Sequence, residues 1–181
     1  MTLKLLIVGG AGYIGSHMVK RAGALGVEVV TLDNLISGHR DAVTCGEFVQ
    51  GDIADRSLLD ALFASHRFDA VMHFASHIEV GESVRLPAKY YRNNVANTLT
   101  LLEAMLAARV NKFIFSSTAA IFGTPQYSPI DERHPRAPIN PYGRTKNMVE
   151  EILQDLDRAH GLRSVCLRYF NAAGADPEGQ L

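Results

Sequence analysis

The chain opens with Leu3-Lys4-Leu5-Leu6-Ile7-Val8-Gly9-Gly10-Ala11-Gly12-Tyr13-Ile14-Gly15, an apolar run that leads directly into a glycine-rich turn. A short apolar run ending at glycine predicts a buried strand, and the pattern after it predicts a helix. Glycines at positions 9, 12 and 15 permit a tight turn, close approach of a pyrophosphate and close helix–strand packing. The amide groups that begin such a helix attract an anion. This stretch therefore predicts the phosphate-binding turn of a dinucleotide site, to which Tyr13 and Ile14 also belong.

Apolar runs alternate with helical patterns along the whole chain. This alternation predicts a Rossmann-type α/β fold, a doubly wound parallel sheet of about six strands with helices on both faces. The expected strands are residues 3–8, 27–32, 48–50, 70–74, 112–117 and 164–169, and the expected helices are 13–25, 57–64, 87–108 and 141–160. Four prolines predict a loop over 123–140. With 181 residues, we expect 1–181 to be one dinucleotide-binding domain.

Composition excludes several classes of partner. Hydrophobic residues make up 47%, charged residues 20%, and the net charge is −1 without a basic run, which argues against nucleic acid and anionic membranes. No apolar stretch approaches the length of a transmembrane helix. Cys45 and Cys166 are far apart, without the paired spacing of a metal site, and are typical of reduced thiols. We therefore expect a cytoplasmic protein without a bound metal.

An acidic residue, Asp33, ends the second expected strand 18 positions after Gly15. A carboxylate there can accept hydrogen bonds from a ribose and would repel a 2′-phosphate, which favours NAD over NADP. His39 and Arg40 follow Asp33 closely in sequence, which weakens the preference for NAD over NADP slightly. After the third expected strand, Asp52 either approaches the adenine or makes an ordinary turn at the start of a helix.

The second informative feature is the pair Tyr142 and Lys146, which lie four residues apart on one face of an expected helix. A phenol has a pKa near 10, so its pKa must fall by about three units for it to act as a base near neutrality. That shift requires roughly 4 kcal/mol of stabilisation of the phenolate. A lysine charge about 6 Å away supplies roughly 3 kcal/mol at an effective dielectric near 20. The positive charge of an oxidised nicotinamide ring would supply the rest. We therefore expect Tyr142 to become a base mainly when NAD⁺ is bound.

Hydroxyl groups follow the fifth expected strand in Ser116-Ser117-Thr118. The carboxyl edge of a doubly wound sheet is where such folds bind ligands. Thr118 is a candidate to bond a substrate hydroxyl and to pass its proton to Tyr142. The alternative is that these hydroxyls, above all that of Ser116, only satisfy backbone groups.

Together these motifs resemble the extended short-chain dehydrogenase/reductase family, in the branch whose members epimerise UDP-hexoses at C4. The resemblance covers the whole chain. It is carried by residues 9–17, 33–35, 51–53, 73–75, 80–83 and 91–95, and most specifically by Arg168-Tyr169-Phe170-Asn171-Ala172-Ala173-Gly174-Ala175. The resemblance implies catalytic roles for Thr118, Tyr142 and Lys146 and contacts of Asn171, Thr118 and Tyr142 with the UDP-sugar. It also implies NAD contacts from Gly9, Gly12, Tyr13, Ile14, Gly15, Asp33, Asn34, Asp52, Ile53, Phe74, Ala75, Asn93, Ser116, Lys146 and Tyr169.

The same resemblance implies a homodimer through the helices near 87–108 and 141–160 and a carboxy-terminal substrate domain that this chain lacks. We therefore expect the isolated chain to have weak or no epimerase activity. Ile78 departs from the family, since some members place a lysine there to contact the cofactor phosphates. Two alternatives remain: another nucleotide-sugar enzyme, or a non-catalytic NAD-binding fragment. Ala119 and Ala120 argue against the 4,6-dehydratases, which place an acidic residue just after the threonine.

Overall fold

The computed structural model describes residues 2–181 and contains one sheet of six parallel strands in the order β3-β2-β1-β4-β5-β6. The strands are β1 (Lys4–Val8), β2 (Glu28–Asp33), β3 (Glu47–Gln50), β4 (Ala70–His73), β5 (Lys112–Ser116) and β6 (Arg163–Leu167). This arrangement confirms the predicted Rossmann-type sheet. Strand order reverses between β1 and β4, and such a reversal opens a crevice at the carboxyl ends of the strands.

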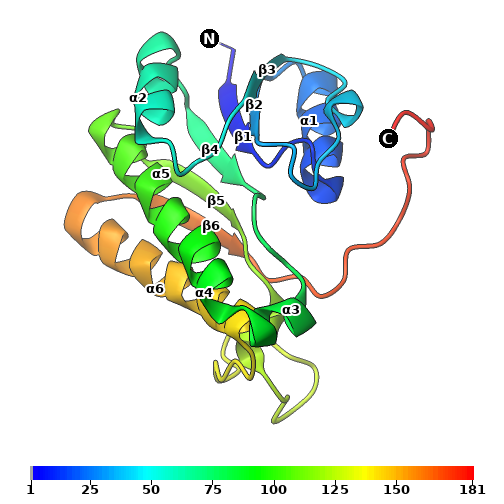
Figure 1. Ribbon diagram of the computed structural model, residues 1–181, viewed down its shortest axis with the longest axis vertical. Coiled ribbons are helices and arrows are strands. Elements are labelled where there is room, and N and C mark those ends of the chain that lie inside the picture. The colour runs from blue at the N-terminus through cyan, green and yellow to red at the C-terminus, as the bar shows by residue number, and fades with distance from the viewer. Residues whose placement is uncertain (1) are drawn as a thin grey trace.

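Helices cover both faces of the sheet (Figure 1). They are α1 (Tyr13–Ala24), α2 (Arg56–Ser65), α3 (Val80–Arg85), α4 (Pro87–Tyr90), α5 (Asn97–Ala107) and α6 (Pro141–His160), with short turns η1 (Arg40–Ala42) and η3 (Ala119–Phe122) and a π-helical segment η2 (Tyr91–Ala96). Helix α6 begins where the Asn140 side chain accepts a hydrogen bond from the amide of Gly143, and it ends at Gly161 in the left-handed conformation. Both ends are those expected from the residue types.

The core has two layers because consecutive residues of a strand point to opposite faces. Leu6 and Val8 of β1 join the apolar cluster beneath α2, α5 and α6, whereas Leu5 and Ile7 join the cluster beneath α1. All four are at most 9% exposed. Strand β1 is therefore buried on both sides, which explains why it reads as a continuous apolar run rather than an alternating one.

The expected single helix over 87–108 is more complex in the structure. It consists of α4, η2 and α5 in succession, and the separate helix α3 precedes it. In the π-helical segment Asn94 is 2% exposed, and its amide binds the backbone of His77 and the hydroxyl of Thr145. The widened turn thus ties this helix to the β4–α3 connection and to α6.

Three strands end earlier than expected. The ladder stops at His73, Ser116 and Leu167, so Phe74, Ser117 and residues 168–169 lie beyond it. These residues occupy the connections at the carboxyl edge, where the backbone turns away from the sheet. The prediction was wrong there because apolar and hydroxyl residues that line a cleft resemble strand residues in sequence.

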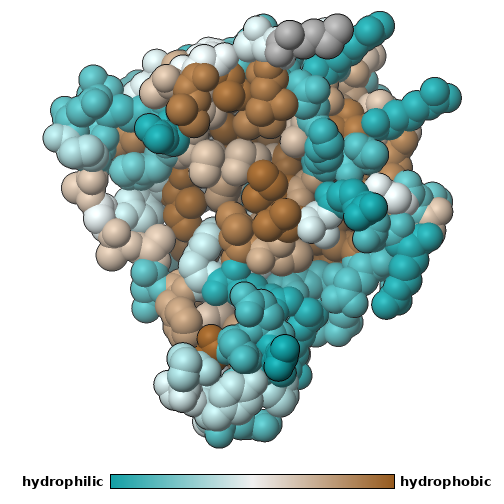
Figure 2. Space-filling view, turned by 180° about the vertical axis from the view of Figure 1, so that it is seen from behind, coloured by the Kyte–Doolittle hydropathy of each residue, from teal (hydrophilic) through white to brown (hydrophobic). Residues whose placement is uncertain are grey.

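One face of the outer strands is apolar and open. Val165 of β6 is 56% exposed, although it pairs with Ile114 of β5 near the middle of the sheet edge. Figure 2 shows apolar side chains gathered in the middle of the face that is hidden in Figure 1. Within residues 2–181, no helix is long and apolar enough to cross a membrane.

Candidate cofactor and catalytic cleft

Two adjoining hollows lie along the carboxyl edge of the sheet. The smaller has a volume of about 90 Å³ and the larger about 800 Å³. Both are lined by Gly9, Gly12, Ser37, Phe74 and Ser76, so they form one continuous cleft. Every site residue named from the sequence lines one hollow or the other.

The smaller hollow lies at the ends of β1, β2 and β3. Of the predicted residues it is lined by Gly9, Gly12, Asp33, Asn34, Asp52, Ile53, Phe74, Ala75 and Asn93. Asp33 is 8% exposed, and its carboxylate accepts bonds from the amides of Ala11 (2.9 Å) and Leu35 (2.8 Å). The carboxylate at the end of β2 therefore also holds the glycine turn in place.

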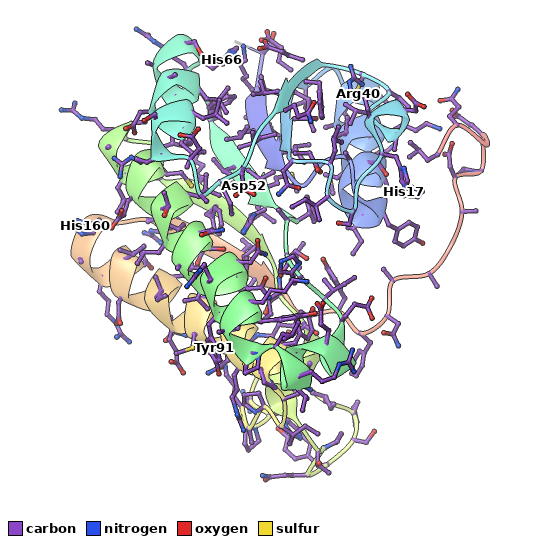
Figure 3. The ribbon with its side chains drawn as sticks, viewed as in Figure 1. His17, Arg40, Asp52, His66, Tyr91 and His160 are labelled. Atoms are coloured by element: carbon purple, nitrogen blue, oxygen red, sulfur yellow. The ribbon has the colours of Figure 1, made fainter. Side chains whose placement is uncertain are left out.

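Asp52 lies in the connection between β3 and α2, near the middle of the molecule (Figure 3). One carboxylate oxygen accepts a bond from Asn34 at 2.7 Å, and the other accepts the amide of Ala54 at 2.8 Å. The second bond is the turn-forming contact of the alternative interpretation. Asp52 both makes that turn and lines the hollow, so the two interpretations are compatible.

Arg40, which argued weakly for NADP, is occupied elsewhere. Its guanidinium donates to the carbonyl of Val43 at 3.2 Å and stacks 4.5 Å from the ring centre of Phe48. Arg40 and His39 are both missing from the residues that line the two hollows. Neither residue is therefore placed to neutralise a 2′-phosphate beside Asp33.

The three glycines of the turn serve different purposes. A Cβ added at Gly9 would lie 2.4 Å from the amide nitrogen of Ala75, and one at Gly15 would lie 2.1 Å from the carbonyl oxygen of Gly9. Close packing explains both. A Cβ at Gly12 would meet only the carbonyl oxygen of Gly9, at 3.4 Å, and would otherwise point into open space. The missing side chain at Gly12 leaves the start of α1 bare toward the cleft, as an approaching pyrophosphate requires.

The larger hollow brings together the residues of the predicted chemistry. It is lined by Thr118, Tyr142, Lys146, Ser116, Tyr169 and Asn171, and on the opposite wall by Tyr13, Ile14 and Gly15. The Lys146 ammonium donates to the carbonyl of Ser116 at 2.8 Å and lies 6.0 Å from the ring centre of Tyr142. The Ser116 hydroxyl bonds the Tyr169 hydroxyl. Ser116 thus contacts Lys146 through its carbonyl and Tyr169 through its hydroxyl. Its hydroxyl bonds a side chain of the cleft, whereas the alternative role was to satisfy backbone groups.

The ionisation of the pair differs from the simplest expectation. Lys146 is 2% exposed, and burial lowers its pKa to about 7, so much of its charge is lost near neutrality. Burial also raises the pKa of Tyr142, an effect that a hydrogen bond from Thr118 partly opposes. In the free chain, removal from water is therefore the largest influence on the pKa of Tyr142, and it opposes the action of this tyrosine as a base. The positive charge of a bound cofactor would have to lower that pKa.

A buried ionic cluster lies beside the cleft. The carboxylate of Glu150, whose side chain is 1% exposed, accepts bonds from the Ser117 hydroxyl (2.6 Å) and from Arg168 (Nη2 at 2.7 Å). Arg136 lies 3.3 Å from the same carboxylate. Nothing in the sequence pattern indicated this cluster, because the partners of Glu150 lie 14 to 33 residues from it along the chain.

The segment after β6 crosses from that strand to α1, near His17 (Figures 1 and 3). The Tyr13 hydroxyl donates to the carbonyl of Gly174 at 2.7 Å, and the Lys20 ammonium contacts both carboxylate oxygens of Asp176 at 2.7 Å. Asn171 lines the larger hollow on this segment. The segment therefore bridges the two walls of the cleft.

The structure adds cleft residues that sequence reasoning missed, namely Ser37, Gly38, Ser76 and His77. They lie in connections with no strand or helix pattern of their own, so their position relative to the cleft could not be inferred. Ile78, named above as a departure from the family pattern, lines the larger hollow and is 62% exposed. It brings no charge to the cleft.

The profile of a known protein family, described as the NAD dependent epimerase/dehydratase family, matches residues 5–180. The chain belongs to this family. Among curated members of the epimerase/dehydratase family, it is 55% identical to the UDP-glucose 4-epimerase of Rhizobium meliloti over 98% of this chain and 54% of that protein. It is 54% identical to the enzyme of the same name from Azospirillum brasilense, over 98% of this chain and 51% of that protein.

Solved structures of family members agree. A UDP-glucose 4-epimerase from Brucella ovis in complex with NAD has a TM-score of 0.98 and 50% identity, over 99% of this chain and 55% of that one. A UDP-glucose 4-epimerase from Bifidobacterium longum in complex with NAD⁺ and UDP has a TM-score of 0.95 and 38% identity, over 98% of this chain and 56% of that one. The chain thus spans about half the length of the relatives that it matches.

Proposed function

We propose that this chain is the NAD-binding domain of an epimerase that inverts C4 of a UDP-hexose such as UDP-glucose or UDP-galactose. The observation that carries the proposal is that Tyr142, Lys146 and Thr118 line the same cleft of about 800 Å³ as the glycine turn. The proposed proton-transfer group therefore lines the same cleft as the turn proposed to bind the pyrophosphate. The names of the family members, with NAD and UDP in the solved complexes, support the choice of cofactor and substrate.

The residues present fit NAD. Gly12 leaves a bare helix start for the pyrophosphate, and Asp33 lines the end of the cleft where the ribose of adenosine would lie. Asn93, Phe74 and Ala75 line the same hollow and are proposed to hold the cofactor there. Arg40, the nearest candidate partner for a 2′-phosphate, is bound to Val43 and Phe48 instead. These placements support NAD over NADP.

When bound, NAD⁺ supplies the acceptor that takes hydride from C4 of the sugar and the donor that returns it. The chain's own residues handle the proton. Tyr142 accepts the proton of the 4-hydroxyl and gives it back to the opposite epimer, while Thr118 orients that hydroxyl. Lys146 holds the carbonyl of Ser116 at 2.8 Å and adds positive charge beside the phenol when protonated. Asn171 is placed to bind the UDP portion.

The coverage of only about half of each relative's length suggests the test. We propose that residues 1–181 bind NAD⁺ and have weak or no epimerase activity, the substrate being held mainly by a further, carboxy-terminal domain. Calorimetric titration with NAD⁺ and NADP⁺ should show binding of the former and markedly weaker binding of the latter. Incubation with UDP-galactose followed by assay of UDP-glucose should show little turnover. Equal affinity for both cofactors would contradict the role of Asp33, and robust turnover would contradict the need for another domain.

A reductase or another nucleotide-sugar enzyme remains the second candidate, since Tyr142 and Lys146 would serve it equally. The 4,6-dehydratases fit less well, because η3 places Ala119 and Ala120 at the cleft wall without an acidic group. A chain that binds NAD⁺ without chemistry of its own is the third candidate, and the two assays above distinguish it.

We propose a homodimer through the α4–α5 helix and α6. Leu99 and Met148 on these helices are 37% and 43% exposed, which supports an apolar contact surface there. Cys45 and Cys166 are both free thiols, which supports a cytoplasmic location.

A further inference from the structure

Glu150 carries a buried carboxylate that lies outside the cleft and takes no part in the chemistry proposed above. Its side chain is 1% exposed. A charge removed from water this far is costly unless several donors satisfy it. Glu150 meets that condition, because Ser117, Arg168 and Arg136 all surround it.

The partners of Glu150 come from three different segments. Ser117 follows β5 and donates to Oε1 at 2.6 Å. Arg168 follows β6 and donates from Nε (3.0 Å) and Nη2 (2.7 Å), one bond to each carboxylate oxygen. Arg136 belongs to the loop that precedes α6 and lies 3.3 Å away. One carboxylate on α6 thus joins the ends of both outer strands and the preceding loop.

Each bonded group adjoins a residue of the cleft. Ser117 stands between Ser116, whose carbonyl accepts from Lys146, and Thr118. Arg168 directly precedes Tyr169, whose hydroxyl bonds Ser116. Along α6, residues 142, 146 and 150 follow at intervals of four, so Glu150 lies one turn beyond Lys146 on the same face.

We propose that Glu150 is a positioning residue for the catalytic group: through Ser117 its carboxylate holds the Ser116–Thr118 segment against the face of α6 that carries Lys146 and Tyr142. The role in chemistry rests on the proposed function. The positioning itself is a property of the free chain and can be tested without substrate or cofactor.

Lys146 reports on this arrangement because it is buried against the held segment. The titratable groups that face it are His73 of β4, whose own pKa is lowered by burial and by Lys146, and Tyr142 of α6. Around Glu150 the charged or titratable neighbours are Arg168, Arg136 and Cys166. If the Ser116–Thr118 segment loosens, water reaches Lys146. Since burial is what lowers its pKa, that pKa should rise.

The test is the titration of Lys146 followed by carbon NMR at Cε, which is practical because the chain has five lysines and Lys146→Met assigns the signal. Glu150→Gln removes the charge, and Ser117→Ala, the milder variant, removes only the hydroxyl. Ser117→Ala leaves every charge in place and should raise the pKa of Lys146 by about one pH unit. Glu150→Gln should raise it less, because the loss of a nearby negative charge by itself favours the neutral amine. The double variant should shift it no further than Glu150→Gln alone, because both changes break the same connection.

The matched control is Glu151→Gln, which changes an exposed carboxylate on the next position of α6. It should leave the Lys146 titration unchanged. A second readout is hydrogen exchange at the amide of Ala119, which donates to the carbonyl of Tyr169 at 3.0 Å across the two strand ends. This amide should exchange about tenfold faster in Glu150→Gln and Ser117→Ala, but not in the control.

The proposal is overturned if both variants lower only the melting temperature while the Lys146 titration and the Ala119 exchange stay as in the unmodified chain. Glu150 would then be a purely structural ion pair. NAD⁺ affinity, measured in parallel, separates this outcome from failure of the proposed function. If the unmodified chain does not bind NAD⁺, the proposed function is refuted. The Lys146 titration would still decide whether Glu150 is a positioning residue.

Discussion

Lys146 makes the folding stability of this chain depend on pH in a way that can be calculated. Its pKa is about 7 in the fold, whereas an unburied lysine has a value of 10.5. The unfolded chain therefore holds a proton that the folded chain releases between these two values. Stability should rise as pH increases through this window, and the contribution should be lost as pH falls toward 7.

The magnitude follows from the two pKa values. At about 1.4 kcal/mol per pH unit, the full window corresponds to roughly 5 kcal/mol. Between pH 6.5 and pH 9.5 the expected gain from Lys146 is about 3 kcal/mol, since part of the window lies above pH 9.5. This gain is a large fraction of the free energy of unfolding of a typical domain, which is roughly 5–15 kcal/mol.

The substitution Lys146→Met isolates this contribution. Methionine fills a similar volume without a charge, although the carbonyl of Ser116 loses its donor. Urea unfolding of both proteins at pH 6.5 and 9.5 gives the free energy of unfolding of each. From pH 9.5 to pH 6.5 the parent should lose about 3 kcal/mol of unfolding free energy that the variant keeps. The stability of the variant relative to the parent should therefore rise by about 3 kcal/mol. Lys112→Met, at an exposed position, is the matched control and should show no such trend.

A difference between variant and parent that stays constant within about 1 kcal/mol over this range would refute the reasoning, since the expected change is about three times larger. Such a result would mean that Lys146 keeps its proton in the fold at alkaline pH. The site would then carry a permanent positive charge beside Tyr142, which would oppose the rise that burial causes in the pKa of this tyrosine.

Further predictions concern single positions. Gly12→Val should leave the fold intact, because a Cβ there meets only one atom, at 3.4 Å. It should nevertheless weaken NAD⁺ binding, measured by calorimetry, at least tenfold (about 1.4 kcal/mol). Unchanged affinity would exclude a pyrophosphate at this turn. Tyr142→Phe in a chain that carries the substrate domain should reduce turnover by about a thousandfold without changing its circular dichroism, and near-normal activity would dismiss the phenol as the base. Lys20→Met should speed hydrogen exchange of the amides of residues 174–180 about tenfold. The double variant with the charges swapped, Lys20→Asp with Asp176→Lys, should restore slow exchange if the ion pair holds this segment. Met148→Glu should convert a dimer to a monomer in sedimentation, whereas an unaltered dimer would place the interface elsewhere.

Much of the fold follows from local pattern. Strand β1 is a continuous apolar run because both its faces are buried, and the ends of α6 follow from Asn140, Pro141 and Gly161. The use of the carboxyl edge for ligands could be inferred from the predicted doubly wound parallel sheet. The predicted cleft residues therefore lie together, since glycine turn, strand ends and the start of α6 all meet at that edge.

What could not be predicted depends on contacts between distant segments. The π-helical turn at Tyr91–Ala96 accompanies Asn94 bonding His77 and Thr145, and no local residue type signals it. The low pKa of Lys146 is a consequence of burial by the whole fold. Spacing showed that Tyr142 and Lys146 share a helix face, but spacing carries no information about how much water reaches them.

The order of the strands has a consequence for a chain emerging from the ribosome. On one side of β1, the strands β4, β5 and β6 follow one another outward in the order of synthesis. The smaller hollow, beside Asp33 and Asp52, is lined by residues between 8 and 93, and the larger hollow by residues between 9 and 172. The core against Leu6 and Val8 also contains Phe113, Phe115 and Leu153, so β1 is buried on both sides only after these residues have been made. Because domains generally fold as units, we expect both hollows to form together, late in synthesis.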